Sequence, residues 1–201
     1  MRNKFDMQLE LLSEQLIHMG ELCETAINKA TTALQQGSME QAKEVIAADE
    51  EIDQMEKDIE RLCLKLLLQQ QPVARDLRQI SAALKMITDM ERIGDQTSDI
   101  AEIIISSEWE KMDENLDKLT AMATGVSKMV RNSVTAYVEK DLELARTVMK
   151  DDDEIDDYFD EIRDQMIQLI READSRDGRK IFDLSFIQHL TYSSLNISFF
   201  N

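Results

Sequence analysis

Three carboxylates recur every four residues in the stretch MERIGDQTSD, residues 90–99, where Glu91, Asp95 and Asp99 flank a glycine, Gly94. Four residues advance a helix by about 400°, so on a helix these carboxylates would form one slowly turning stripe. Like charges at this spacing repel each other and destabilise a helix. Carboxylate oxygens are also the ligands that hard cations such as magnesium, manganese and iron prefer. The stretch therefore raises the hypothesis that a bound cation offsets the repulsion.

A second acidic pair, Asp49 and Asp53, has the same four-residue spacing. The single proline, Pro72, suits the first turn of a helix, because that position leaves the backbone N–H unpaired in any case. If the segments on either side of this turn form an antiparallel hairpin, residues equally distant from the turn lie level with each other. Asp49 then falls beside Asp95, and Asp53 falls beside Glu91. Four carboxylates with no His or Cys among them would favour a hard, oxygen-preferring cation.

A solvated acidic face is the alternative interpretation of these carboxylates, with Arg92 or a neighbouring arginine neutralising Glu91 in place of a metal. The two histidines, His18 and His189, are expected at the surface. Neither follows the Glu-x-x-His spacing of di-iron helical bundles. The sequence contains no glycine-rich phosphate loop and no Ser/His/Asp set, so an enzymatic function has no support in it.

The elements that must position the carboxylates are long helices. Good helix formers dominate the 201 residues, which include five glycines and 5% aromatic residues. Ser38 and Gln41 make a capping box directly after Gly37, where a first helix should end and a second begin. Continuing the third apolar pattern places Glu91 where a hydrophobe is expected and Gly94 where a neighbouring backbone or ligand could approach closely. The three patterns, in steps of four and three residues, run through Phe5, Leu9, Leu12, Leu16, Met19, Cys23, Ala26, Ala30 and Ala33, then Val45, Ala48, Ile52, Met55, Ile59, Leu62 and Leu66, then Leu77, Ile80, Leu84 and Ile87.

The second half of the chain repeats the first at a shift of 103 residues. We therefore expect an all-α fold of two tandem three-helix bundles related by internal duplication, with domains at residues 1–107 and 116–201. The shift makes Asp152 and Asp156 the equivalents of Asp49 and Asp53, and so adds them to the candidate metal ligands. Other matched pairs are Met19 and Met122, Ala33 and Ala136, Ala42 and Ala145, Val45 and Val148, and Ile52 and Ile155.

Charge and hydropathy limit where the protein acts and what it binds. The net charge of -18 opposes direct DNA binding, because phosphate contacts need clustered Lys and Arg. No run of about 20 apolar residues occurs, so the sequence predicts neither a signal peptide nor a spanning helix, and we expect a cytoplasmic protein. Cys23 and Cys63 lack metal-site spacing and are expected to be small buried hydrophobes.

Four segments together carry a family resemblance: the opening FDMQLELLSEQLIHMGELCETAI, the acidic DEEID, the turn QQPVARDLR and the helix ERIGDQTSDIAE. In this combination the chain resembles the PhoU family of phosphate-uptake accessory proteins and phosphate-regulon repressors, from residue 1 to about residue 185. The resemblance implies a negative regulator that acts with the ATPase subunit of the phosphate ABC transporter and with a phosphate-sensing histidine kinase. Such a protein would reach the membrane only through its partners. The resemblance is also compatible with a homodimer.

The resemblance also implies metal binding, because family members bind clustered metal ions through E/D-x-x-x-D motifs. These motifs map onto Asp49, Asp53, Glu91, Asp95 and, at the edge of the set, Asp99. The ion would be divalent or trivalent and hard, namely magnesium, manganese or iron, with zinc as a further candidate. The alternative function is an acidic helical scaffold or interaction protein without a metal site.

The chain departs from the family pattern near its end. The family repeats the ERIGD signature in its last helix, which the shift of 103 residues would place at 194–198, but these positions read SLNIS here. Asp152 and Asp156 therefore have no expected carboxylate partners, and the last helix of the second bundle should be atypical or truncated.

Overall fold

In the structure, a computed structural model, the described residues form five helices joined by short connections, and no strand occurs among them. This agrees with the all-α fold that the sequence predicts. The described residues are 2–69, 73–106 and 116–172. The helices are α1 (Arg2–Gln36), α2 (Met39–Gln69), α3 (Ala74–Ser106), α4 (Leu116–Glu139) and α5 (Leu142–Glu172). The predictions for Pro72 and for the last helix, including positions 194–198, lie outside the described residues.

The turn between α1 and α2 has the geometry that its sequence predicts. Gly37 adopts a positive φ of 64°, which glycine allows without steric cost. The Ser38 N–H donates to the Ala33 carbonyl (2.9 Å), and the Gln41 N–H donates to Ser38 Oγ (3.3 Å), so Ser38 caps α2.

The turn between α4 and α5 repeats this arrangement 103 residues later. Lys140 takes the positive φ (59°), and the Asp141 N–H donates to the Ala136 carbonyl over 2.9 Å. Asp141 Oδ1 then accepts hydrogen bonds from the N–H groups of Glu143 and Leu144, which caps α5. The duplication therefore extends to the caps, although glycine is replaced by lysine.

The apolar stripes of α1 and α2 largely form the core as predicted, with Cys23 and Cys63 buried in it, while Leu9, Ala48 and Met55 are only partly buried. The stripe of α3 is displaced from the predicted one. Leu77 is exposed, while Leu84 and Glu91 are only half-buried. Since α3 packs against both α1 and α2, its buried surface is centred one residue away from these three positions. The buried surface of α3 includes Ile80, Ala83, Met86, Ile87, Met90, Ile93, Gly94, Thr97, Ser98, Ile100, Ala101 and Ile104.

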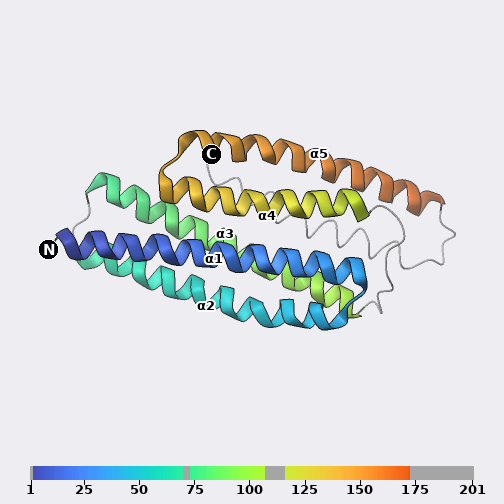
Figure 1. Cartoon of the computed structure of the whole chain (residues 1–201), viewed down its shortest axis with the longest axis horizontal. Coiled ribbons are helices and arrows are strands. Elements are labelled where there is room, and N and C mark those ends of the chain that lie inside the picture. The colour runs from blue at the N-terminus through green and yellow to red at the C-terminus, as the bar shows by residue number, and fades with distance from the viewer. Residues whose placement is uncertain (1, 70–72, 107–115, 173–201) are drawn as a thin grey trace.

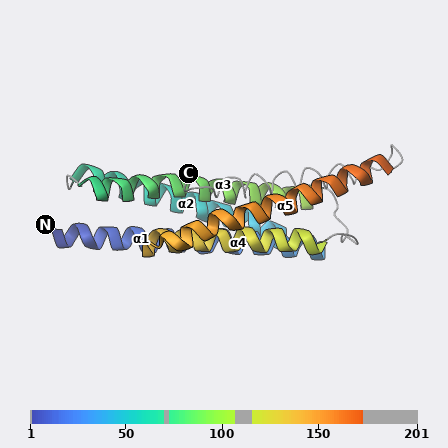
Figure 2. The ribbon, with the colours of Figure 1, turned by 90° about the horizontal axis from the view of Figure 1, so that it is seen from above.

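The two halves of the chain meet along α1 and α4 and share one hydrophobic core. The two helices lie side by side in one layer, with α2 and α3 in a second layer and α5 crossing obliquely (Figures 1 and 2). Polar links join the halves from end to end: Gln35 Nε2 donates to Thr120 Oγ1 (2.7 Å), Arg131 pairs with Glu24, and Tyr137 Oη donates to the Gln79 carbonyl (2.9 Å). None of these five helices is both long and apolar enough to cross a membrane.

Candidate metal centre

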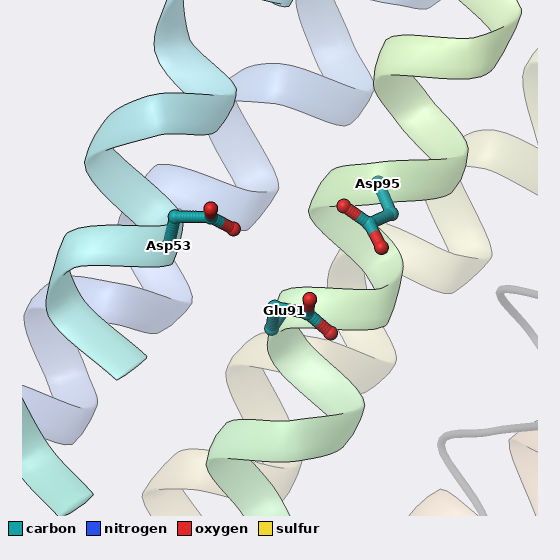
Figure 3. Close-up of side chains that lie close together, drawn as sticks. All are labelled: Asp53, Glu91 and Asp95. Carbon is teal, nitrogen blue, oxygen red and sulfur yellow. The ribbon is translucent and has the colours of Figure 1, made fainter. Parts of the chain in front are cut away.

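Three of the predicted carboxylates come together between α2 and α3. Asp53 on α2 and Glu91 and Asp95 on α3 each offer one oxygen, and these oxygens lie within 4.8 Å of one another. Figure 3 shows the Asp53 side chain directed from α2 toward the two side chains on α3. The antiparallel hairpin thus places residues level with each other as its symmetry about the turn predicts. We call Asp53, Glu91 and Asp95 the carboxylate cluster.

The cluster lies at the edge of the core, where water is only partly excluded. Asp53 and Glu91 are half-buried and Asp95 is exposed. Lys57 Nζ lies 3.4 Å from Asp53 Oδ2, but the Lys57 side chain is 59% exposed and the Asp53 side chain 41% exposed, so solvent weakens this ion pair. Arg92 pairs with Asp89 over 3.4 Å.

Burial and mutual repulsion make the cluster unfavourable when all three groups are ionised without a cation. Burial and then the carboxylates of Asp95, Glu56, Asp53 and Asp49 raise the pKa of Glu91 to about 7. The pKa of Asp95 is also raised, first by burial and then by Asp53 and Asp99. A group of acids that strongly disfavours its own ionisation favours a bound cation.

Asp49 lies one helical turn from Asp53 and faces Gly94. Its Oδ1 atom is buried and has no hydrogen-bond partner among the described residues. A Cβ atom placed at Gly94 would lie 2.8 Å from this oxygen and 3.1 Å from two atoms of Ile52. The sequence predicts the close approach of a neighbouring backbone or ligand at Gly94, whereas the described neighbours that approach it are the side chains of Asp49 and Ile52.

The environment of Asp49 tests whether a cation fits this site. Burial, followed by the charges of Asp95 and Asp53, raises its pKa to about 6, while the Ser98 hydroxyl acts in the opposite direction. A buried acceptor without a partner is costly, and an ion or an ion-bound water beside it would supply the missing interaction. The all-oxygen donor set fits a hard cation.

The structure does not bring the other predicted ligands into this cluster. Asp99 is exposed, one turn beyond Asp95, and its charge raises the pKa of Asp95. Asp152 and Asp156 lie on α5, and over the described parts of the chain they join no group of three ligands. Burial and then Asp152 raise the pKa of Asp156, so the second repeat concentrates charge as the first does.

Sequence reasoning missed Glu56. This half-buried residue lies three positions after Asp53 and raises the pKa of Glu91. Burial raises the pKa of Glu56 itself, while the Thr88 hydroxyl on α3 acts in the opposite direction. The hairpin rule that paired Asp53 with Glu91 also pairs Glu56 with Thr88, so the signal was present in the sequence. Glu60 follows one turn later and raises the pKa of Glu56 in turn.

Comparisons with known proteins agree with the duplicated helical architecture. The model of the PhoU domain family matches residues 16–104 and again residues 108–191. The chain is 36% identical to a phosphate-specific transport system accessory protein PhoU homolog of Aquifex aeolicus, over 90% of this chain and 81% of that protein. The corresponding homolog of Clostridium acetobutylicum is 35% identical over 87% of this chain and 80% of that protein.

Two solved structures have the same fold. The crystal structure of PhoU from Pseudomonas aeruginosa matches with a TM-score of 0.81 at 29% identity, covering 97% of this chain and 90% of that one. The phosphate transport system regulatory protein PhoU from Streptococcus pneumoniae matches with a TM-score of 0.85 at 25% identity, covering 96% and 91%. These are the names of accessory and regulatory proteins, not of enzymes, in agreement with the non-enzymatic role expected from the sequence. With its domain matched twice along most of its length, the chain belongs to the PhoU family.

Proposed function

We propose that this protein restrains phosphate uptake and phosphate-starvation signalling by binding to the phosphate transporter, and that its first repeat carries a metal ion. The names of its relatives, accessory proteins of a phosphate-specific transport system, support the association with the transporter. The partners would be the ATPase subunit of the transporter and a phosphate-sensing histidine kinase. The protein would act in the cytoplasm without contacting DNA, as two domains at residues 1–107 and 116–201.

The carboxylate cluster is the observation that carries the metal proposal. Asp53, Glu91 and Asp95 would supply the ligands, and Asp49 would bind the ion directly or through a water molecule. Asp99 would contribute charge at the edge of the site. Magnesium, manganese or iron fits this donor set best, and zinc is a further candidate.

A metal held between α2 and α3 would join the two helices at mid-length. Its charge would offset the repulsion that raises the pKa of Glu91 and Asp49. We therefore assign the ion a structural and regulatory role, in which loading of the site sets the geometry of the hairpin that partners contact. Asp152 and Asp156 would attract cations in the second repeat more weakly.

A deletion strain tests the regulatory function. Phosphate-starvation genes, followed with a reporter in high phosphate, should become active when the gene is deleted and should be repressed again by the wild-type copy. A complementing copy with Glu91→Gln and Asp95→Asn tests whether repression needs the cluster. Normal repression in the deletion strain would contradict the regulatory function.

An acidic helical scaffold without a metal is the second candidate, favoured by the cation already present in the Lys57–Asp53 ion pair. Metal counted after dialysis of the purified protein separates the two. A scaffold would retain no more metal than its Glu91→Gln/Asp95→Asn variant.

A further inference from the structure

The end of the α2–α3 hairpin is basic, although the whole chain has a net charge of -18. Asp76 is the only acidic residue of the sequence between residues 61 and 88. Its carboxylate accepts a hydrogen bond from the Val73 N–H over 3.3 Å, at the start of α3. The basic residues of the same stretch are Arg61, Lys65, Arg75, Arg78 and Lys85. The hairpin end is therefore a positive pole on a negatively charged molecule.

Three of these cations are not neutralised by a neighbouring carboxylate. Lys65, Arg75 and Arg78 are exposed and form no ion pair with any residue that the structure describes. Arg61, in contrast, pairs with Asp58 on its own helix. Exposed cations without a partner keep their attraction for an external anion, and several of them together attract an anionic surface.

Large aliphatic side chains are exposed among these cations. Leu68 is 83% exposed at the end of α2, and Val73 is 64% exposed before the start of α3. Because α2 and α3 are antiparallel, Leu68 lies level with the first turn of α3. We call the exposed aliphatic residues at this end the hairpin-end patch: Leu64, Leu68, Val73 and Leu77. Exposed apolar side chains flanked by Lys and Arg are typical of surfaces that enter the membrane interface.

The described helices of the second half do not cover this end. In both views the hairpin end extends beyond the turn between α4 and α5 (Figures 1 and 2). The α4 helix reaches the start of α3 through the hydrogen bond from Tyr137 to Gln79, yet Leu77 remains exposed. The α1 helix lies in the other layer, so the free surface is the side of α2 and α3 that faces away from it.

We propose that the hairpin end binds directly to an anionic lipid bilayer. The hairpin-end patch would enter the headgroup region, and Lys65, Arg75 and Arg78 would contact lipid phosphates. Burial of apolar side chains and attraction to anionic lipids together set the strength of such binding. This contact goes beyond the proposed function and adds to the attachment through partners that the family resemblance implies.

The position of the carboxylates favours a planar lipid surface over an acidic protein segment. From Asp53 to Leu68 the axis of α2 rises by about 22 Å. This is more than twice the Debye length of about 8 Å, so a membrane contacted through the hairpin end would not repel the carboxylate cluster. An acidic helix lying along α2 and α3 would instead meet Glu60 and Glu56 within two to three turns of the patch.

Co-sedimentation of the purified full chain with vesicles tests the proposal. The vesicles contain phosphatidylcholine and phosphatidylglycerol in equal parts, and a chelator keeps divalent ions from bridging carboxylates and headgroups. Arg75→Gln/Arg78→Gln should weaken binding at least about tenfold, because each Lys or Arg near an anionic surface contributes about fivefold. Arg146→Gln/Lys150→Gln removes the same charge from exposed positions of α5 and should leave binding unchanged.

A second pair of variants tests the aliphatic side chains. Leu64→Ser/Leu68→Ser should weaken binding about tenfold with little change in Tm, because both side chains are exposed. Met7→Ser/Leu11→Ser is the matched control. It removes exposed side chains from α1 at the same end of the molecule, in the other layer, and should change binding less than about twofold.

The outcomes separate this inference from the proposed function. Equal binding to pure phosphatidylcholine vesicles overturns the inference, as do equal losses in the hairpin-end variants and their controls. Absence of vesicle binding by the wild-type chain also overturns it, and leaves the proposed function intact because the deletion-strain test involves no lipid. If the purified transporter ATPase subunit binds the wild type but not Arg75→Gln/Arg78→Gln, and vesicles do not bind, the hairpin end contacts an acidic protein segment and the lipid proposal is wrong.

Discussion

Glu91 is a carboxylate at the edge of the core that forms no ion pair with any residue that the structure describes. It is half-buried, and the charges acting on it come from Asp95, Glu56, Asp53 and Asp49, all of the same sign. Such a residue is tolerated either by taking up a proton or by sharing a cation. Cation binding and proton uptake at Glu91 can each be measured.

Removing the α3 half of the cluster should abolish metal-induced stabilisation. A ligand at 100 times its dissociation constant stabilises the folded state by about 2.7 kcal/mol, which for this chain length raises Tm by roughly 5–10 °C. Manganese or magnesium should produce this rise in the wild-type protein and not in Glu91→Gln/Asp95→Asn. The metal-free variant should be no less stable than the wild type, because the substitutions relieve repulsion.

The second repeat provides the matched control. Asp152→Asn/Asp156→Asn removes the same number of charges from α5, where the expected partners at 194–198 are not acidic. This variant should keep most of the rise in Tm. If it loses the rise while Glu91→Gln/Asp95→Asn keeps it, the metal is not bound at the carboxylate cluster.

The raised pKa of Glu91 predicts how metal-free stability depends on pH. Burial and neighbouring charges raise this pKa from 4.5 to about 7, so between these values the folded state binds more protons than the unfolded state. The contribution of Glu91 to the free energy of unfolding is therefore fully present below about pH 4.5 and is lost as the pH rises through about 7. Gln mimics the protonated acid and does not titrate.

Denaturant unfolding in a chelator measures this effect. The wild-type protein should lose stability relative to Glu91→Gln as the pH is raised from about 5 to about 8. Parallel stability curves for the two proteins over this range would show that Glu91 has the same pKa in the folded and unfolded states.

At the scale of the elements, the antiparallel α2–α3 hairpin brings the ligands together and Gly94 sets how closely the helices pack. Alanine would normally gain about 1 kcal/mol over glycine inside a helix. At Gly94 the added Cβ would meet Asp49 Oδ1 at 2.8 Å and Ile52 at 3.1 Å. Overpacking of this kind costs about 1–3 kcal/mol, so the net effect should be a loss of stability.

Gly94→Ala should lower Tm and also weaken the response to metal, because it displaces Asp49, which lies beside the carboxylate cluster. Gly20→Ala is the control, since its Cβ would approach Val134 at 3.1 Å on the contact between α1 and α4, away from the carboxylates. Thermal unfolding with and without manganese distinguishes the two positions. An unchanged metal response in Gly94→Ala would remove Asp49 from the site.

At the scale of the whole molecule, α1 belongs to both halves, because it packs against α2, α3 and α4 within one hydrophobic core. The polar links between the halves are partly exposed, as in the ion pair of Arg131 with Glu24. Exposed ion pairs contribute little to stability, whereas buried apolar contacts contribute several times more. The halves should therefore unfold together, held by apolar contacts.

Two substitutions on α4 test this cooperativity. Val134→Ala removes buried methyl groups at the α1 contact and should lower the free energy of unfolding by about 2 kcal/mol. Arg131→Ala should lower it by less than about 1 kcal/mol. Urea unfolding followed by circular dichroism should show a single transition in both variants; a separate transition for one half would contradict the shared core.

The sequence by itself determined the helices, the duplication and the level at which the carboxylates meet. Capping residues such as Ser38 and the regular spacing of apolar residues act locally, so they can be interpreted without a structure. An antiparallel hairpin with a short turn leaves only one register, and this is why Asp53 could be paired with Glu91.

Only the tertiary structure decided how each helix is rotated and what covers it. The apolar spacing of α3 placed Leu77, Leu84 and Glu91 in the seam, but packing against two neighbours moved them to its edge. The spacing of α1 likewise did not reveal that α4 covers a second side of it. A periodic pattern specifies a buried stripe only to within about one residue, which is about 100° of rotation about the helix axis. The number and position of the neighbouring helices depend on residues far away in the chain. The exposure of Leu68 and the burial of Asp49 Oδ1 follow from those neighbours.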